Sequence, residues 1–291
     1  MFPENLERKR KVQLSGIAVI SMLILLMNLT ACGSTASTSA ASTPTASTPA
    51  TGDNATANLQ HLPTGSAQLN YDATAKTLVV SITLTGLAPK STHPAHIHQG
   101  SCAKPTKTVL YSLNNVVANA QGQGSSTTTL HNVASDIAAT GWFINVHNGP
   151  VMQTAAQSVS IACGTISNPN KATTVTTTMG PSTDANENAT GRATFTLVNG
   201  TMTVHLDVQG LAPNSAHAAH IHAGSCNATK GVLYNLSPLV ANANGIAQKT
   251  ISFKSVKNIP TSGWAINIHN STDVSTQTGY NPILCGNVVS A

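Results

Sequence analysis

The chain carries the same histidine-rich segment twice, and this internal repeat constrains its fold more than any other feature. The stretch TGLAPKSTHPAHIHQGSC, which ends at Cys102, recurs as QGLAPNSAHAAHIHAGSC, which ends at Cys226. Further along each copy, GWFINVHN is matched by GWAINIHN, and IACG by ILCG. The sequence therefore predicts two domains of the same structure, each of about 100 residues.

Within each repeat the apolar residues alternate with polar ones, which is the period of a half-buried β-strand and not of a helix. The dipeptide Asn199-Gly200 separates two such runs and is typical of a two-residue hairpin turn. We therefore expect an all-β chain of two tandem antiparallel β-sandwiches or barrels. The alternating positions are Leu78, Val80, Ile82 and Leu84 in the first repeat, and Met202, Val204, Leu206 and Val208 in the second.

Two stretches rich in Ser, Thr, Ala and Pro divide the chain. Neither has an apolar periodicity that would bury a face, so both are expected to be flexible linkers. The expected boundaries are a signal peptide at 1–32, a linker at 33–62, a first domain at 63–166, a second linker at 167–188 and a second domain at 189–291.

The amino terminus is typical of a secreted protein. A basic run at 8–11 precedes an apolar run at 12–27, and the letters LTAC then end at Cys32. This pattern resembles the bacterial lipoprotein signal, in which the cysteine is lipidated and becomes the first residue. The expected location is the outer face of the cytoplasmic membrane, with the membrane as a partner through lipidated Cys32. A permanent transmembrane anchor is the alternative, although the apolar run is short for one.

The cysteine count agrees with an oxidising compartment. Apart from Cys32, the chain has four cysteines, and two fall in each repeat. We expect one disulfide within each domain. The formal net charge is only +5, which is too small to indicate a nucleic-acid partner.

The histidines predict two metal sites. Side chains two positions apart on a strand point to the same face, so His96 and His98 can converge on one ion, as can His220 and His222. His147 and His269 end a later strand in each repeat and supply a third nitrogen. Three neutral imidazoles with an open position suit copper or zinc, and the affinity order favours copper. The alternative is a structural role, such as bonding a buried carbonyl. The remaining histidines, His61, His131 and His205, are expected at the solvated surface.

With these motifs the repeats resemble the copper–zinc superoxide dismutase superfamily, and "AHIHAGSCNATKGVLYNL" also resembles the chordin-type (CHRD) domain. The superfamily resemblance implies a Greek-key β-sandwich with copper on His96, His98 and His147, and on His220, His222 and His269. It further implies structural roles for His93 and His217, and the disulfides Cys102–Cys163 and Cys226–Cys285.

Two departures leave the activity open. The long zinc-binding loop has no room here, because only 47 to 49 residues separate the paired histidines from the later one, and Ser160 and Pro282 stand where the dismutases place a guiding arginine. One hypothesis is copper binding, with superoxide or another small oxidant as substrate. The second is a non-enzymatic CHRD-type module that binds a partner, and a zinc hydrolase is a third. No catalytic residue is assigned.

Overall fold

A computed structural model describes residues 54–291. The expected signal peptide with Cys32, and the expected linker as far as residue 53, lie outside the described residues. Within the described part of the chain, no helix has the length and apolar character needed to cross a membrane. The described chain is almost entirely antiparallel β-structure, which confirms the all-β prediction.

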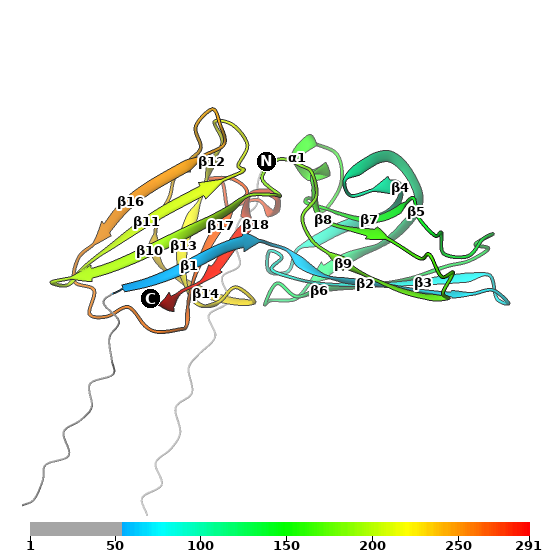
Figure 1. The fold of residues 1–291 in the computed structure, drawn as a ribbon, viewed down its shortest axis with the longest axis horizontal. Coiled ribbons are helices and arrows are strands. Elements are labelled where there is room, and N and C mark those ends of the chain that lie inside the picture. Colours follow the sequence, from blue (N-terminus) through cyan, green and yellow to red (C-terminus); the bar gives the residue numbers. More distant parts are fainter. Residues whose placement is uncertain (1–53) are drawn as a thin grey trace, which may run out of the picture. The chain divides into compact units, whose positions relative to one another are not determined.

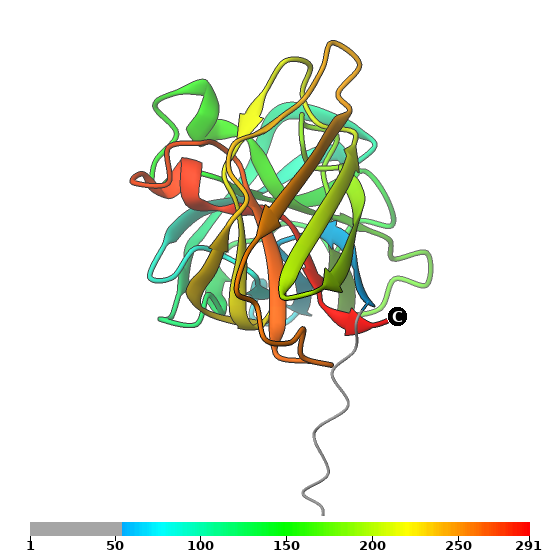
Figure 2. The same ribbon diagram turned by 90° about the vertical axis from the view of Figure 1, so that its left-hand side faces the viewer.

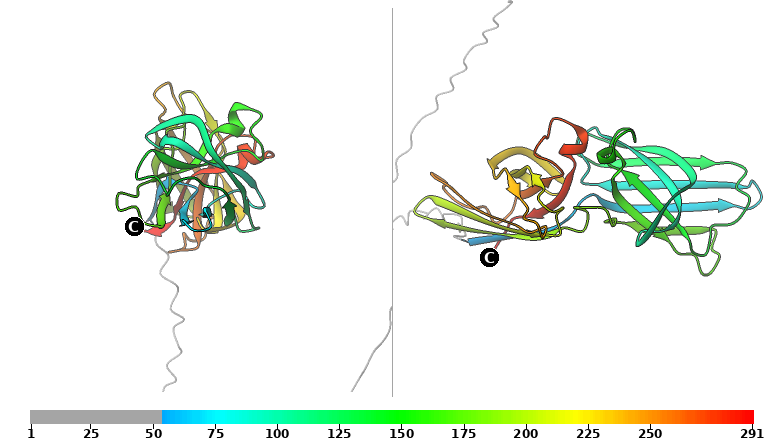
Figure 3. Two further views of the ribbon diagram at one scale, coloured as in Figure 1. Left: turned by 90° about the vertical axis from the view of Figure 1, so that its right-hand side faces the viewer. Right: turned by 90° about the horizontal axis from the view of Figure 1, so that it is seen from above.

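The first repeat forms one curled sheet with the strand order β8-β7-β4-β5-β6-β3-β2-β9 (Figure 3, left). A bridge between Cys163 in β8 and Gly180, next to β9, brings the two ends of this sheet together. The strands are β2 (Thr64–Asp72), β3 (Thr77–Thr85), β4 (Thr92–Ser101), β5 (Lys104–Ala118), β6 (Gly124–Leu130), β7 (Trp142–His147), β8 (Ser160–Ile166) and β9 (Thr174–Met179), with a short helix α1 (Ala155–Ser158) between β7 and β8.

The second repeat has the sheet order β14-β13-β17-β18-β1-β10-β11-β16, with β19 beside β1 and a separate pair of β12 and β15. Its elements are β1 (Asn54–His61), β10 (Thr190–Val198), β11 (Thr201–Gln209), β12 (Ala216–His217), β13 (Ala219–Ser225), β14 (Ala228–Asn235), β15 (Leu239–Val240), β16 (Ala247–Phe253), β17 (Trp264–His269), α2 (Gln277–Tyr280), β18 (Pro282–Asn287) and β19 (Val289–Ser290). Asn199 and Gly200 both have positive φ angles at the turn between β10 and β11, as the predicted hairpin requires.

The alternating apolar residues form the two cores. All eight predicted positions are at most 2% exposed, in β3 of the first repeat and β11 of the second. The expected disulfides are also present, Cys102–Cys163 and Cys226–Cys285, with Cα–Cα distances of 5.8 and 5.7 Å. Each closes a loop of about 60 residues, for which chain entropy gives roughly 4 kcal/mol. Disulfides of this kind are typical of an oxidising, extracytoplasmic compartment.

The two repeats exchange their first strands. β1 begins the described chain, yet it pairs with β10 and β18 of the second repeat (Figures 1 and 2). β9 leads into the second repeat, yet it pairs with β2 of the first. The two pairings are equivalent, because Ala57 faces Ala193 in one and Thr177 faces Ala67 in the other. Each domain is therefore completed by a strand from the other repeat.

Both exchanged strands lie in segments that the sequence analysis assigned to linkers, and there the structure differs from the expectation. The inward residues of β1 are Ala55, Ala57 and Leu59, all at most 2% exposed. Two of these three are alanines, which carry little hydrophobic signal, and β9 is mostly threonine. Alanine and threonine give these strands little hydrophobic contrast, so their composition resembles that of a linker.

The strand exchange predicts which engineered disulfide forms. Asn58 is exposed and lies opposite Arg192 in β10, so Asn58→Cys with Arg192→Cys is expected to crosslink, since directly opposed strand residues have suitable Cα separations. Without exchange Asn58 would face Ser66, the residue of β2 that Thr178 of β9 faces in the structure. Peptide mapping of the oxidised protein reads out the bond, and crosslinking by Asn58→Cys with Ser66→Cys instead would contradict the exchange.

Candidate metal centres

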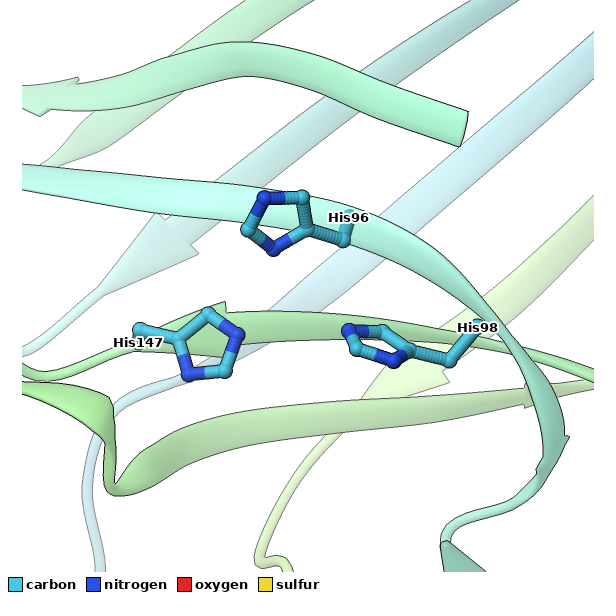
Figure 4. A group of neighbouring side chains, drawn as sticks. All are labelled: His96, His98 and His147. Atoms are coloured by element: carbon cyan, nitrogen blue, oxygen red, sulfur yellow. The ribbon is translucent and has the colours of Figure 1, made fainter. Parts of the chain in front are cut away.

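The first repeat brings His96, His98 and His147 together (Figure 4). His96 and His98 lie on β4, and Ile97 between them is fully buried in the core, as the two-residue period requires. His147 ends β7, which pairs with β4. One ring nitrogen from each histidine lies within 4.8 Å of the other two.

The second repeat reproduces this arrangement with His220 and His222 on β13 and His269 at the end of β17. The ring centroids of the three pairs are 5.7, 5.3 and 6.3 Å apart, against 5.6, 5.4 and 6.2 Å in the first repeat. The two equivalent strand pairs thus hold the same constellation. The two sequence motifs, H-x-H and a strand-ending histidine, therefore correspond to one spatial site in each repeat.

The ring nitrogens that face each site have no protein partner. They are Nδ1 of His96, Nε2 of His98 and Nε2 of His147, and in the second repeat Nδ1 of His220 and Nε2 of His222. Buried polar atoms are normally hydrogen-bonded, so these five nitrogens without partners need an explanation. A cation that accepts three imidazole lone pairs at each triad would explain them.

Backbone carbonyls fix the orientation of several of these rings. Nδ1–H of His147 donates to the carbonyl of Ser158 at 2.8 Å, and Nδ1–H of His269 donates to Tyr280 at 2.5 Å. Nδ1–H of His222 donates to Lys230 at 2.8 Å. With the proton on Nδ1, the Nε2 atom presents a lone pair to the centre, which is the usual support of a metal-ligating histidine.

Burial lowers the pKa of His96, His98, His147, His220 and His269. Burial lowers the pKa of His96 to about 4, helped by repulsion from His147 and His98. Burial also lowers the pKa of His269 to about 4, despite the carbonyl of Tyr280, which raises it. Near neutral pH these imidazoles are therefore unprotonated, the form that binds a metal ion.

His93 and His217 lie behind the triads, where the resemblance implied structural roles. Each is fully buried, and its Nδ1–H donates to the carbonyl of the strand-ending histidine, at 2.8 Å to His147 and 2.9 Å to His269. The Nε2 of His93 lies 2.7 Å from Oγ of Ser91. These two histidines thus fix the backbone of a ligand residue in each repeat.

The surroundings of the two triads differ. The ring of Phe143 stacks on His98 with a centroid distance of 5.2 Å, whereas the equivalent residue in the second repeat is Ala265. The ring of Tyr280 lies 4.9 Å from that of His269, where the first repeat has Ser158. His96 and His220 are only half-buried, so each triad has one edge nearer to solvent.

The other histidines divide into two kinds. His131 and His205 are exposed, as expected. The surface expectation for His61 is wrong, because its side chain is 8% exposed and its Nδ1 lies 3.6 Å from Oε2 of the buried Glu187. Burial lowers the pKa of His61 to about 4 and raises that of Glu187 well above its usual value. This pair joins the end of β1 to the segment before β10, where the chain crosses between repeats. No local sequence pattern predicts a contact between two residues so far apart in the chain.

Comparison with known families identifies the class of protein. The model of the CHRD domain matches residues 34–150 and 171–275, which is most of the chain in two copies. The chain therefore belongs to the CHRD-domain family.

Other comparisons add little. No curated protein matches the sequence. Among solved structures, the clock protein EA4 is 18% identical over 35% of this chain and 88% of its own, with a TM-score of 0.27. CBD12 from CALX1.2 is 12% identical over 67% of this chain and 76% of its own, with a TM-score of 0.17. These scores are too low to support any inference about this chain.

The burial of His61 and Glu187 predicts that the two residues change the pH dependence of stability in opposite directions. In the unfolded chain His61 takes up a proton below about pH 6.5, whereas in the folded protein it does so only near pH 4. The free energy of unfolding therefore decreases as the pH falls from about 6.5 to about 4. His61→Gln is expected to remove about 2 kcal/mol of the loss in unfolding free energy between pH 7.5 and pH 5. The raised pKa of Glu187 acts in the other direction, and Glu187→Gln is expected to stabilise the protein at pH 7.5.

Urea unfolding at the two pH values measures both effects. His131→Gln is the matched control, because His131 is exposed, and it is expected to leave the pH dependence unchanged. An unaltered pH dependence in His61→Gln, or a loss of stability at pH 7.5 in Glu187→Gln, would show that the pair is not buried as described.

Proposed function

We propose that this protein is an extracytoplasmic copper-binding protein with one three-histidine copper site in each CHRD-type domain. The observation that carries the proposal is the convergence of three histidine nitrogens to within 4.8 Å in each repeat, where three buried ring nitrogens of the first triad and two of the second have no protein partner. A structural role for these histidines would be expected to leave their inward nitrogens hydrogen-bonded.

The donor set favours copper over the alternatives. Imidazole suits copper and zinc, whereas magnesium and calcium prefer oxygen ligands. A structural zinc site normally has four protein ligands, and within residues 54–291 each group of potential ligands has only three. At three nitrogens the general affinity order places copper above zinc. His96, His98 and His147 would hold the first ion, and His220, His222 and His269 the second.

A copper ion at such a site supplies one-electron chemistry, and superoxide or another small oxidant is the substrate class that the resemblance favours. The half-buried edges at His96 and His220 offer the side from which a small molecule approaches. The backbone carbonyls behind His147, His222 and His269 would keep these rings in place when the ion changes charge.

The proposed location follows from the amino terminus and the disulfides. The lipoprotein-like signal ending at Cys32 would anchor the chain to the outer face of the membrane, and residues 33–53 would separate the anchor from the first described strand. The two disulfides support an oxidising environment.

The second candidate is a non-enzymatic CHRD-type module that binds a partner at the cell surface. Membership of the family favours it, because the match covers both repeats and does not depend on a metal. The first candidate requires the histidine nitrogens to bind a metal and the second does not, so a measurement of metal binding distinguishes them.

Copper binding predicts a defined stoichiometry. The metal-free protein is expected to bind two copper ions per chain. His96→Ala with His98→Ala should remove one, His220→Ala with His222→Ala the other, and the fourfold variant both. His131→Ala with His205→Ala is the matched control, because these two histidines are exposed, and it should bind two. Titration with a competing chelator measures the number and the affinity. Binding that survives in the fourfold variant, or is lost in the control, would contradict the proposal.

Superoxide consumption by the copper-loaded protein separates the chemistry from the binding. If superoxide is the substrate, the unaltered protein should consume it catalytically, each single-site variant should keep part of the activity, and the fourfold variant should lose it. Copper binding without any consumption would leave a copper-binding protein that does not act on superoxide.

A further inference from the structure

Helix α2 in the second repeat contacts the residues that follow the strand ligand in both metal centres. The carbonyl of Thr278 accepts hydrogen bonds from Nδ2 of Asn148 and Nδ2 of Asn270, each at 3.1 Å. Asn148 directly follows His147 of the first triad, and Asn270 directly follows His269 of the second. A single carbonyl group is thus shared by the two ligand strands.

Two further side chains attach this segment to the first centre. Nε2 of Gln277 donates to the carbonyl of Asn148 at 3.0 Å, and Nδ2 of Asn281 donates to the same carbonyl at 3.0 Å. Asn148 is fully buried and Asn281 is 2% exposed, so water does not readily replace these bonds. The side chain of Gln277 also bonds both backbone groups of Thr92, next to His93.

The same helix supports the second centre directly. The carbonyl of Tyr280 accepts the Nδ1 proton of His269, and the ring of Tyr280 packs against that histidine. A continuous path therefore runs from His147 through Asn148 and Asn281 to Tyr280 and His269. Peptide bonds join His147 to Asn148 and Tyr280 to Asn281, and hydrogen bonds join Asn148 to Asn281 and Tyr280 to His269.

The first repeat has no counterpart of this bridge. Helix α1 occupies the equivalent position, and its carbonyls bond His147 and Asn148 of its own repeat. Ala155 and Val159 stand where α2 and its cap have Gln277 and Asn281, and neither side chain can donate a hydrogen bond. The two repeats thus differ at the two positions whose side chains, in α2 and its cap, bond the other repeat.

We infer that Gln277 and Asn281 are positioning residues for the first metal centre, although they belong to the second repeat, and that the two centres bind metal as a coupled pair. This inference rests on the proposed function. A metal ion at either centre fixes a ligand strand and with it α2. The second ion then binds to a segment that is already ordered, which gives positive coupling without a change of fold.

The test measures the first centre alone. In a background of His220→Ala with His222→Ala, only the first triad binds copper. Adding Gln277→Ala with Asn281→Val gives α2 the residues of α1, and the copper affinity of the first centre is expected to fall about tenfold. Its electron paramagnetic resonance spectrum should change as well. Gln248→Ala, an exposed substitution elsewhere in the second repeat, is the control and should change neither.

A second measurement leaves α2 unaltered, in case the double substitution prevents folding. With independent centres, the overall constant for binding two coppers equals the product of the constants of the two single-site variants. Coupling predicts that the overall constant is at least about fivefold larger. Equal values, or an unchanged first centre in a folded Gln277→Ala with Asn281→Val protein, would overturn the inference while the proposed function stands. An unaltered protein that binds no copper would overturn both.

Discussion

The pairing of β1 with β10 and β18 is the interaction on which the rest of the structure depends. Because β1 and β9 each complete the sheet of the other repeat, the first sheet consists of β2 to β9, whereas the second joins β1 to strands that begin only at β10. The chain crosses between repeats twice, and His61 and Glu187 meet where the two crossings lie close together. The two repeats also meet at α2 of the second, which bonds Asn148 of the first.

Part of this architecture could be predicted from the sequence. Period-two alternation located β3 and β11 and their buried faces, and the same period placed His96 and His98 on one side of β4. The exchanged strands could not be predicted in this way, because alanine and threonine carry little hydrophobic contrast. Their partners lie more than 100 residues away, and local patterns contain no information about such pairings.

The histidines show the same division between local and distant information. The spacing H-x-H and the strand-ending histidine were sufficient to expect each triad. The carbonyls that orient the rings, from Ser158, Lys230 and Tyr280, depend on the main-chain path of other segments and have no residue-type signal. The burial of His61 was missed for the same reason. Histidines of similar appearance in the sequence thus become candidate ligands, supports for the ligand backbone, or a buried pair.

The two centres share a first layer of three imidazoles but differ in the next layer. Phe143 covers one ring in the first centre, whereas Tyr280 packs against a ring in the second. A duplicated domain can keep a ligand set while the residues around it change. Because these surroundings set affinity and redox behaviour, the two proposed sites need not have the same role.

Anomalous X-ray scattering at the copper edge, from crystals of the copper-loaded protein, tests the central claim most directly. Two peaks per chain are predicted, one between His96, His98 and His147 and one between His220, His222 and His269. Peaks only at exposed histidines such as His131 and His205, or no ordered copper, would contradict the assignment of the triads as copper sites.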